Sequence, residues 1–319
     1  MLTSLSTVPN LVVGAGVPLS QHTRFALGGP ADLFVETSDP GAFIAALAIA
    51  RGSGLPHTMI GGGSNLIVSD AGYRGIILKF NGGDITIERA RLTVQAGASL
   101  QTLVDTANAH GLKGLETMTG IPGFAGAAIY GNAGAYGHSI SERVARVHFH
   151  DGEGYRTFSN EECEFQYRES IFKRHKDWTI LSAELNLSPD DPEALTKISA
   201  EILAIRNEKY PPTMKCAGSI FKNFLLADLP ADIVPANVIR EGKVPSAYFL
   251  EQAGAKGLSI GDIHVATYHA NLIFNGGNGT AADLLTVILE LKTRVYERFG
   301  IKLEEEVQYV GFASDARLR

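Results

Sequence analysis

One short stretch, KCAGSIFKNF at residues 215–224, places a lone hydroxyl between a glycine and an apolar pair. Its serine, Ser219, is either an ordinary turn residue or a proton donor. A serine hydroxyl is a poor acid in water, so proton donation needs a strongly basic acceptor and a neighbour that stabilises the alkoxide. Lys222 or Asn223 could give that help if the chain turns at Gly218.

Two glycine-rich stretches could hold a phosphate or a flat cofactor. IGGGSNLIVSD, residues 60–70, sets three glycines and two hydrogen-bonding side chains between apolar strands, a pattern typical of a nest of backbone N–H groups that accepts a pyrophosphate. A tight hairpin is the alternative for this stretch alone. GIPGFAGAAIYGNAGAYG, residues 120–137, has six glycines and few large side chains, so it packs on another backbone or leaves room for a flat ring system. Two such loops together favour a cofactor.

Four further stretches have an ordinary interpretation beside a functional one. VVGAGVPL, residues 12–19, lacks the third glycine and the following helix of a dinucleotide fingerprint, so a turn is expected. His148 and His150 alternate on a strand without enough further ligands, so we expect surface histidines and no metal. Arg168, in FQYRES, is either functional or paired with a nearby glutamate. In LEEEV, residues 303–307, a strand would put Glu304 and Glu306 on one face and Glu305 on the other.

Composition limits the class of protein. A chain of 319 residues with 45% hydrophobic and 19% charged residues predicts a folded protein of about two domains. The formal charge of −6 argues against a nucleic-acid-binding surface. Two distant cysteines, Cys163 and Cys216, do not make a disulfide framework. The sequence shows no secretory signal and no apolar stretch long enough to span a membrane, so a cytoplasmic protein is expected.

The elements that must position these residues include both helices and strands. Apolar spacing, caps and turns predict strands and helices in alternation. They include a helix over DPGAFIAALAIARGSG, residues 39–54, that starts at Asp-Pro, a hairpin across DGEG and a long helix that stops at Pro-Pro. We therefore predict an α+β fold. Its predicted domains are 1–188, in two lobes split near residue 80, and 189–319, which ends in a strand at 303–311.

Six motifs make the sequence familiar: TRFALGGPADLFVE, IGGGSNLIVSDAGYRG, GIPGFAGAAIYGNAGAYG, YRES, AGSIFKN and GIKLEEEVQYVG. In this order, from about residue 22 to 311, they resemble the UDP-N-acetylenolpyruvoylglucosamine reductase family. The resemblance implies a two-lobed FAD-binding module of the p-cresol methylhydroxylase and vanillyl-alcohol oxidase type. A separate α+β substrate-binding domain follows it, and the last strand of that domain returns toward the active site.

The same resemblance implies an activity and its partners. The family uses NADPH to reduce the enolpyruvyl group of UDP-N-acetylglucosamine enolpyruvate, giving UDP-N-acetylmuramate for peptidoglycan and hence for cell-wall growth and division. We expect a cytoplasmic monomer that binds this small substrate and NADPH, with no nucleic-acid or membrane partner. The alternatives are an FAD-dependent sugar or alcohol oxidase of the same cofactor fold, which would produce peroxide, and a nucleotide-sugar-binding regulator without activity.

The resemblance also assigns cofactor contacts. Related oxidases tether FAD through a histidine in the first loop, whereas Ser64 follows the glycines here, so non-covalent FAD is expected. GFAGAA, residues 123–128, replaces the commoner GTVGGA and lacks its hydroxyl. The residues expected to contact FAD are Gly61, Gly62, Gly63, Ser64, Asn65, Gly120, Ile121, Pro122, Gly123, Gly126, Asn132, Ala133 and Gly134.

The family's catalytic residues correspond to Arg168, Ser219 and Glu306. Hydride from reduced flavin adds to C3 of the enol ether, and negative charge develops on the substrate carboxylate. Arg168 and a hydrogen bond from protonated Glu306 would stabilise that charge, and Ser219 would protonate C2. The expected substrate contacts are Tyr167, Lys209 and Asn223. The chain lacks the tyrosine-bearing loop of one branch of the family, so it resembles the shorter type.

Overall fold

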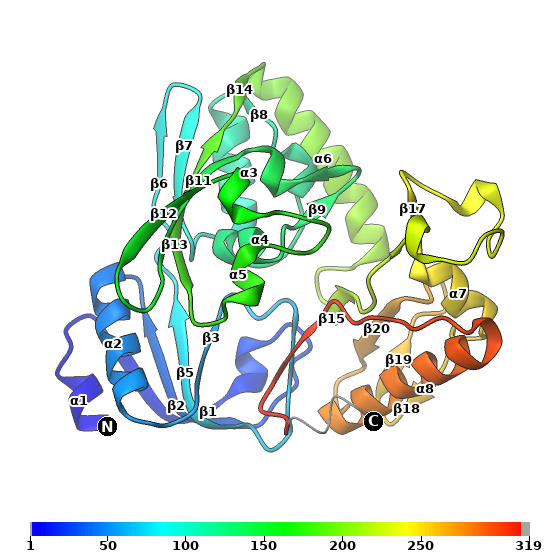
Figure 1. Ribbon diagram of the computed structural model, residues 1–319, viewed down its shortest axis with the longest axis horizontal. Helices are drawn as coiled ribbons and strands as arrows, with labels where there is room; N and C mark the ends of the chain where they lie inside the picture. The colour runs from blue at the N-terminus through cyan, green and yellow to red at the C-terminus, as the bar shows by residue number, and fades with distance from the viewer. Residues whose placement is uncertain (1, 314–319) are drawn as a thin grey trace. The chain divides into compact units, whose positions relative to one another are not determined.

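The computed structural model describes residues 2–313, which form two compact units assembled from separate segments (Figure 1). Unit 1 comprises the chain up to Val17, then Asp32–Gly62 and Gly75–Lys209. Unit 2 comprises Pro18–Ala31, Gly63–Arg74 and the chain from Tyr210 onward. The two units therefore differ from the predicted domains 1–188 and 189–319, because the chain passes between the units several times. The mixture of helices and strands in both is the α+β content that the sequence predicts.

The first part of unit 1 is a four-stranded sheet with two helices. Its elements are α1 (Leu2–Ser6), β1 (Val12–Pro18), β2 (Pro30–Thr37), α2 (Pro40–Gly52), β3 (His57–Ile60) and β5 (Tyr73–Phe80). The strand order is β1-β2-β5-β3, with β3 and β5 parallel. Helix α2 begins where the sequence predicts, since the Asp39 carboxylate accepts from the Ala42 amide at 3.0 Å and Pro40 opens the first turn. Residues 12–18 of VVGAGVPL form the strand β1 and not the expected turn.

The second part of unit 1 is a five-stranded antiparallel sheet with its helices. Its longer elements are β6 (Ile85–Glu88), β7 (Arg91–Gln95), α3 (Leu100–Ala109), α4 (Ala125–Tyr130), β11 (Val144–His150), β12 (Tyr155–Ser159), α5 (Ile171–Arg174), β13 (Thr179–Asn186) and α6 (Pro192–Lys209). The shorter strands are β8 (Leu112–Lys113), β9 (Gly134–Ala135), β10 (His138–Ser139) and β14 (Ser188–Pro189). The strand order is β12-β11-β13-β7-β6, and β11 and β12 form the predicted hairpin.

The long helix α6 belongs to unit 1, although the sequence boundary at 188 assigns it to the second domain. The amide of Asn108, on α3, donates to the Ser199 hydroxyl of α6 at 2.7 Å in a buried position. Strand β14, just before α6, pairs with β8 of unit 1. These contacts attach the helix to unit 1. Their partners lie too far apart in the sequence for a local pattern to predict the contacts.

Unit 2 is built around a four-stranded antiparallel sheet and the helix α8. Its elements are β4 (Leu66–Val68), β15 (Lys215–Ser219), β16 (Phe224–Leu225), β17 (Lys243–Val244), α7 (Ser246–Gln252), β18 (Ser259–Ile260), β19 (Ile263–Val265), β20 (Leu272–Asn275), α8 (Ala281–Phe299) and β21 (Gln308–Val310). The sheet order is β15-β20-β19-β18. Residues 303–307 form no continuous strand, so the predicted last strand is reduced to β21, which pairs in parallel with β4.

Two general expectations concern membranes and metals. None of the helices within residues 2–313 is both long and apolar enough to span a bilayer. The same residues contain no cluster of three His, Cys, Asp or Glu side chains arranged for a metal. His148 instead contacts the Thr157 hydroxyl at 2.8 Å and Glu184 at 3.1 Å, both on neighbouring strands.

Candidate active site

The first glycine loop, residues 61–65, is not a hairpin turn. The strands on either side of it, β3 and β4, pair with β5 and β21 respectively and not with each other. Gly63 has φ of 66°, and a Cβ atom there would overlap the carbonyl oxygen of His22. Within the described residues, the amides of Gly62 and Gly63 donate no hydrogen bond to a carbonyl or side chain. The loop thus keeps the features of an anion-binding nest.

The two glycine loops meet in unit 1. A Cβ atom on Gly62 would lie 3.1 Å from Cα of Gly123, and one on Gly61 would lie 3.4 Å from Cβ of Ala127. The two loops therefore pack closely against each other, with little room for side chains at Gly61 and Gly62. Main chain without side chains is the kind of surface that the pyrophosphate and flat ring of FAD can approach closely.

The second glycine loop is partly committed to packing. The amides of Ala125 and Gly126 donate to the carbonyls of Ala98 and Ala96, each at 2.8 Å. A Cβ atom on Gly126 would lie 2.6 Å from Cβ of Ala96. Glycine is thus required at 126 by close packing on Ala96, the residue after β7, whether or not it contacts a cofactor, and its FAD contact stays a prediction.

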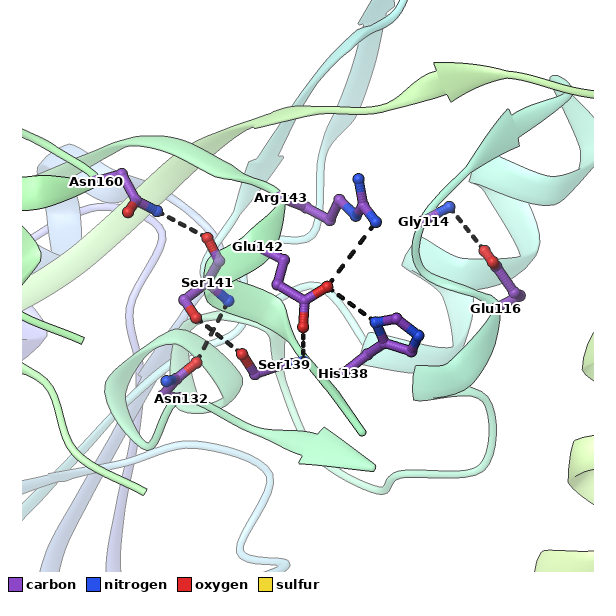
Figure 2. Close-up of polar contacts among 9 residues, drawn as sticks. All are labelled: Gly114, Glu116, Asn132, His138, Ser139, Ser141, Glu142, Arg143 and Asn160. Atoms are coloured by element: carbon purple, nitrogen blue, oxygen red, sulfur yellow. Dashed lines mark hydrogen bonds and ion pairs between the residues drawn. The ribbon is translucent and has the colours of Figure 1, made fainter. Parts of the chain in front are cut away.

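The end of the second loop is fixed by a polar network, shown in Figure 2. The side-chain oxygen of Asn132 accepts from the Ser141 amide at 3.3 Å, and the Ser141 hydroxyl lies 2.8 Å from that of Ser139. Glu142 accepts from the Ser139 amide at 2.8 Å and pairs with His138 at 2.9 Å. This network holds β9 and β10 in place, and with them the predicted FAD contacts Ala133 and Gly134.

Tyr167 and Arg168 are the central residues of a tight turn. Gln166 and Glu169 close it with reciprocal backbone hydrogen bonds of 3.0 and 3.1 Å. Arg168 has φ of 58°, in the left-handed region that L-residues adopt at a cost, and the pattern is typical of a type II turn. The guanidinium carbon of Arg168 lies 5.4 Å from the centre of the Tyr167 ring. The turn presents both side chains at its tip.

The structure brings this turn together with the second glycine loop. Arg168 donates from Nη2 to the Gly134 carbonyl at 3.1 Å, and Asn132 donates from its side-chain amide to the Gln166 carbonyl at 2.8 Å. Lys173 donates to the Arg168 carbonyl at 2.7 Å and so holds the turn from its other side. Asn132, expected to contact FAD, thus has a second task, because its buried amide supports the arginine turn. The sequence gives no signal for that contact.

Ser219 lies in unit 2 at the end of β15. Gly218 before it has φ of 77°, and the pairing of β15 with β20 shifts between Cys216 and Ser219, so the chain does turn at Gly218. Ser219 is half-buried, and its hydroxyl lies 3.3 Å from the hydroxyl of Tyr210. Burial raises the pKa of the neighbouring Cys216 thiol, which keeps it neutral at physiological pH. Sequence reasoning missed Tyr210, since it follows a predicted helix and carries no motif.

Glu306 is held next to the serine strand. Its amide donates to the Ile220 carbonyl at 2.8 Å, and its own carbonyl accepts from the Asn65 side chain at 3.0 Å. Asn65, a predicted FAD contact, therefore connects the first glycine loop to the glutamate segment. Ser219, Asn65 and Glu306 are brought together within unit 2, from three distant parts of the sequence.

The other two glutamates of LEEEV pair with lysines. The Glu304 carboxylate lies 2.5 Å from the Lys222 ammonium, and that of Glu305 lies 2.9 Å from Lys292. Asn223, a predicted substrate contact, accepts from the Ser246 amide at 3.3 Å through its side-chain oxygen. Lys209 is the last residue of α6 in unit 1. Ser64, Gly120, Ile121 and Pro122 lie in the two glycine loops as predicted, and their ligand contacts stay predictions.

Comparisons with known proteins give the family. The FAD binding domain model matches residues 31–157, and the model of the UDP-N-acetylenolpyruvoylglucosamine reductase C-terminal domain matches residues 210–310. The chain is 63% identical over 310 residues to the UDP-N-acetylenolpyruvoylglucosamine reductase of Solibacter usitatus (strain Ellin6076), covering 96% of this chain and 99% of that one. It is 36% identical to that of Anoxybacillus flavithermus (strain DSM 21510 / WK1), covering 92% of each.

A solved structure agrees with these sequence matches. The crystal structure of UDP-N-acetylenolpyruvylglucosamine reductase from Thermus caldophilus has a TM-score of 0.73 and 28% identity, covering 94% of this chain and 99% of that one. Both the FAD module and the C-terminal domain expected from the sequence are therefore present in one chain of the same extent as its relatives. The chain belongs to the UDP-N-acetylenolpyruvoylglucosamine reductase family.

Proposed function

We propose that this chain reduces the enolpyruvyl group of UDP-N-acetylglucosamine enolpyruvate to the lactyl ether, with bound FAD and with NADPH as electron donor. The observation that carries this proposal is the 63% identity to a named reductase over nearly the whole of both chains, together with both family domains. The product, UDP-N-acetylmuramate, places the chain in the synthesis of peptidoglycan precursors. The protein acts as a cytoplasmic monomer on small-molecule substrates.

FAD is held non-covalently by the two glycine loops. The absence of side chains at Gly61, Gly62 and Gly123 suits close approach of FAD to the main chain, and the Ser64 side chain offers no tethering nitrogen. Bound reduced FAD would supply the hydride that adds to the substrate's terminal carbon. Acid precipitation of the protein should therefore release the flavin into solution.

Three side chains carry the remaining chemistry. Arg168, at the tip of its strained turn, stabilises the charge that develops on the substrate carboxylate. Glu306 adds a hydrogen bond to the same charge, and Ser219 delivers the proton to C2. The adjacency of the Glu306 backbone to Ile220 supports this pairing of roles, since it keeps Glu306 close to the serine. Tyr167, Lys209 and Asn223 contact the substrate.

Flavin spectroscopy tests the proposal on the purified full chain. NADPH should bleach a flavin absorbance near that of free FAD, and the enolpyruvyl nucleotide sugar should restore it under anaerobic conditions. Bleaching that recovers only with oxygen, with steady peroxide formation, would instead identify an oxidase. A protein without flavin or turnover would be a binding protein.

A further inference from the structure

The Ser219 hydroxyl has a defined partner. Tyr210 and Ser219 both belong to unit 2, and their hydroxyl oxygens lie 3.3 Å apart. Tyr210 is half-buried and packs against the hydrophobic core of unit 2, while Ser219 is held in register opposite Leu272 of β20. Both oxygens are thus fixed by the fold. A catalytic hydrogen bond is often long in the absence of substrate, so 3.3 Å is compatible with a functional contact.

The direction of this hydrogen bond decides what Ser219 can do. A serine hydroxyl has one proton and two acceptor lone pairs. If Ser219 donated to Tyr210, its proton would be committed to the phenol. If Tyr210 donates instead, the serine proton is free to point at a substrate atom, and the phenol already faces the oxygen that becomes negative.

The charge left on Ser219 makes such a donor valuable. Proton transfer breaks the serine O–H bond and forms a C–H bond at the substrate's C2, whose electron pair makes the new bond. The electrons of the broken bond stay on the serine oxygen as an alkoxide. A phenol is a much stronger acid than an aliphatic alcohol, so it donates a strong hydrogen bond to an alkoxide and can return a proton to it.

The two neighbours considered from the sequence, Lys222 and Asn223, have other contacts. The Lys222 ammonium is 2.5 Å from Glu304, and the Asn223 side-chain oxygen accepts from Ser246. The hydroxyl of Tyr210, by contrast, lies directly against the serine oxygen.

We propose that Tyr210 is a positioning residue for proton delivery: its hydroxyl donates to Ser219 Oγ, aims the serine proton at the substrate and stabilises the resulting alkoxide. This inference rests on the proposed role of Ser219 as the proton donor. It predicts that Tyr210 affects only the half-reaction in which the substrate takes up its proton.

Tyr210→Phe is the direct test, because it removes the hydroxyl and keeps the ring. In stopped-flow measurements on the FAD-loaded protein, the limiting rate of flavin reoxidation by the enolpyruvyl substrate should fall about 10-fold to 10²-fold, the scale of one hydrogen bond to a charged oxygen. The rate of flavin reduction by NADPH and the substrate's dissociation constant, measured from the flavin spectrum of the oxidised protein, should not change. Tyr296→Phe is the matched control, since Tyr296 lies on α8 and is 53% exposed.

Combinations with Ser219 variants separate the two hypotheses. Ser219→Ala should slow reoxidation by roughly 10²-fold to 10⁴-fold. Adding Tyr210→Phe to Ser219→Ala should not slow reoxidation any further. In Ser219→Cys the cost of Tyr210→Phe should shrink, because a thiolate needs less stabilisation than an alkoxide. If Ser219→Ala reoxidises at the wild-type rate, the proposed role of Ser219 fails, and the inference with it. Two outcomes would overturn only the role of Tyr210. In the first, Ser219→Ala slows reoxidation but Tyr210→Phe does not. In the second, Tyr210→Phe slows reoxidation as much in the Ser219→Ala background as in the wild type.

Discussion

Arg168 shows how one residue can combine backbone strain with a proposed catalytic role. Its φ of 58° costs an L-residue about 1 kcal/mol or more, and the cost is met by hydrogen bonds that close and support the turn. A strained backbone at a functional position is expected where the direction of a side chain matters more than local stability.

A pair of variants separates strain from charge at this position. Arg168→Ala removes the side chain and keeps the strain, whereas Arg168→Gly removes both. In both variants the substrate should no longer reoxidise the flavin efficiently. The free energy of unfolding of the glycine variant should exceed that of the alanine variant by about 1 kcal/mol. Urea unfolding of the two proteins measures the difference. Equal midpoints would mean that residue 168 does not need the left-handed conformation.

The three adjacent glutamates allow a second comparison at this scale. Glu306→Gln should slow flavin reoxidation by substrate on the order of 10²-fold and leave reduction by NADPH nearly intact, because it removes the carboxyl group assigned to the developing charge. Glu304→Gln is the control, since that carboxylate is 71% exposed and its ion pair with Lys222 contributes little. A harmful Glu304→Gln beside a harmless Glu306→Gln would show that the catalytic glutamate is Glu304.

At the scale of elements, helix α8 depends on a residue far away in the sequence. The Asp70 carboxylate accepts from the amides of Ala281 and Ala282, at 2.8 and 3.0 Å. Thr280 and Asp283 complete a capping box at the same helix end. Asp70 follows β4, so this contact attaches the segment after the first glycine loop to the longest helix of unit 2.

Asp70→Ala should therefore lower the free energy of unfolding by about 1 to 2 kcal/mol, the scale of a lost helix cap with its charge at the positive end of the helix dipole. Asp70→Asn retains a side-chain acceptor and should lose less. Chemical denaturation followed by circular dichroism measures both. If the alanine and asparagine variants match the wild type, the two hydrogen bonds do not support α8 in solution.

The elements also show what the sequence can predict. Helix α2 and the β11–β12 hairpin were predictable because Asp39, Pro40 and the DGEG turn act within a few residues. The pairing of β4 with β21 was not, since about 240 residues separate the strands and no local pattern specifies a distant partner. The same reason explains how much of the site could be predicted. The glycine loops and the serine were visible as motifs. The contacts of Asn65 and Asn132 were not, because their partners are distant in the sequence, and Tyr210 lies outside any motif.

At the scale of the whole molecule, two buried thiols affect the response to pH. Cys163 and Cys216 are free cysteines in the cores of unit 1 and unit 2 respectively. Burial raises the pKa of Cys163 from 9.0 to about 12, with a smaller contribution from the charge of Glu162. Both thiols should stay unreactive in the folded protein, because the thiolate is the reactive form.

The raised pKa of Cys163 predicts a loss of stability in alkali. Between pH 9 and 12 the unfolded chain ionises this thiol while the folded chain keeps it protonated, so the folded state loses up to about 1.4 kcal/mol of relative stability per pH unit. Cys163→Ala should be somewhat less stable at pH 7 but should lose less stability above pH 9. The two curves of unfolding free energy against pH measure this, and parallel curves would contradict it.

The pairing of β4 with β21 has a consequence for synthesis on the ribosome. Residues 66–68 are translated about 240 residues before their partner at 308–310. The strand that follows the first glycine loop must therefore stay unpaired on this side while those residues are made, at roughly 5 to 20 residues per second. Closing so large a loop is slow and entropically costly. Nascent chains should thus complete the pairing beside the first glycine loop only once residues 308–310 have emerged, and chains that stop before residue 308 should never do so.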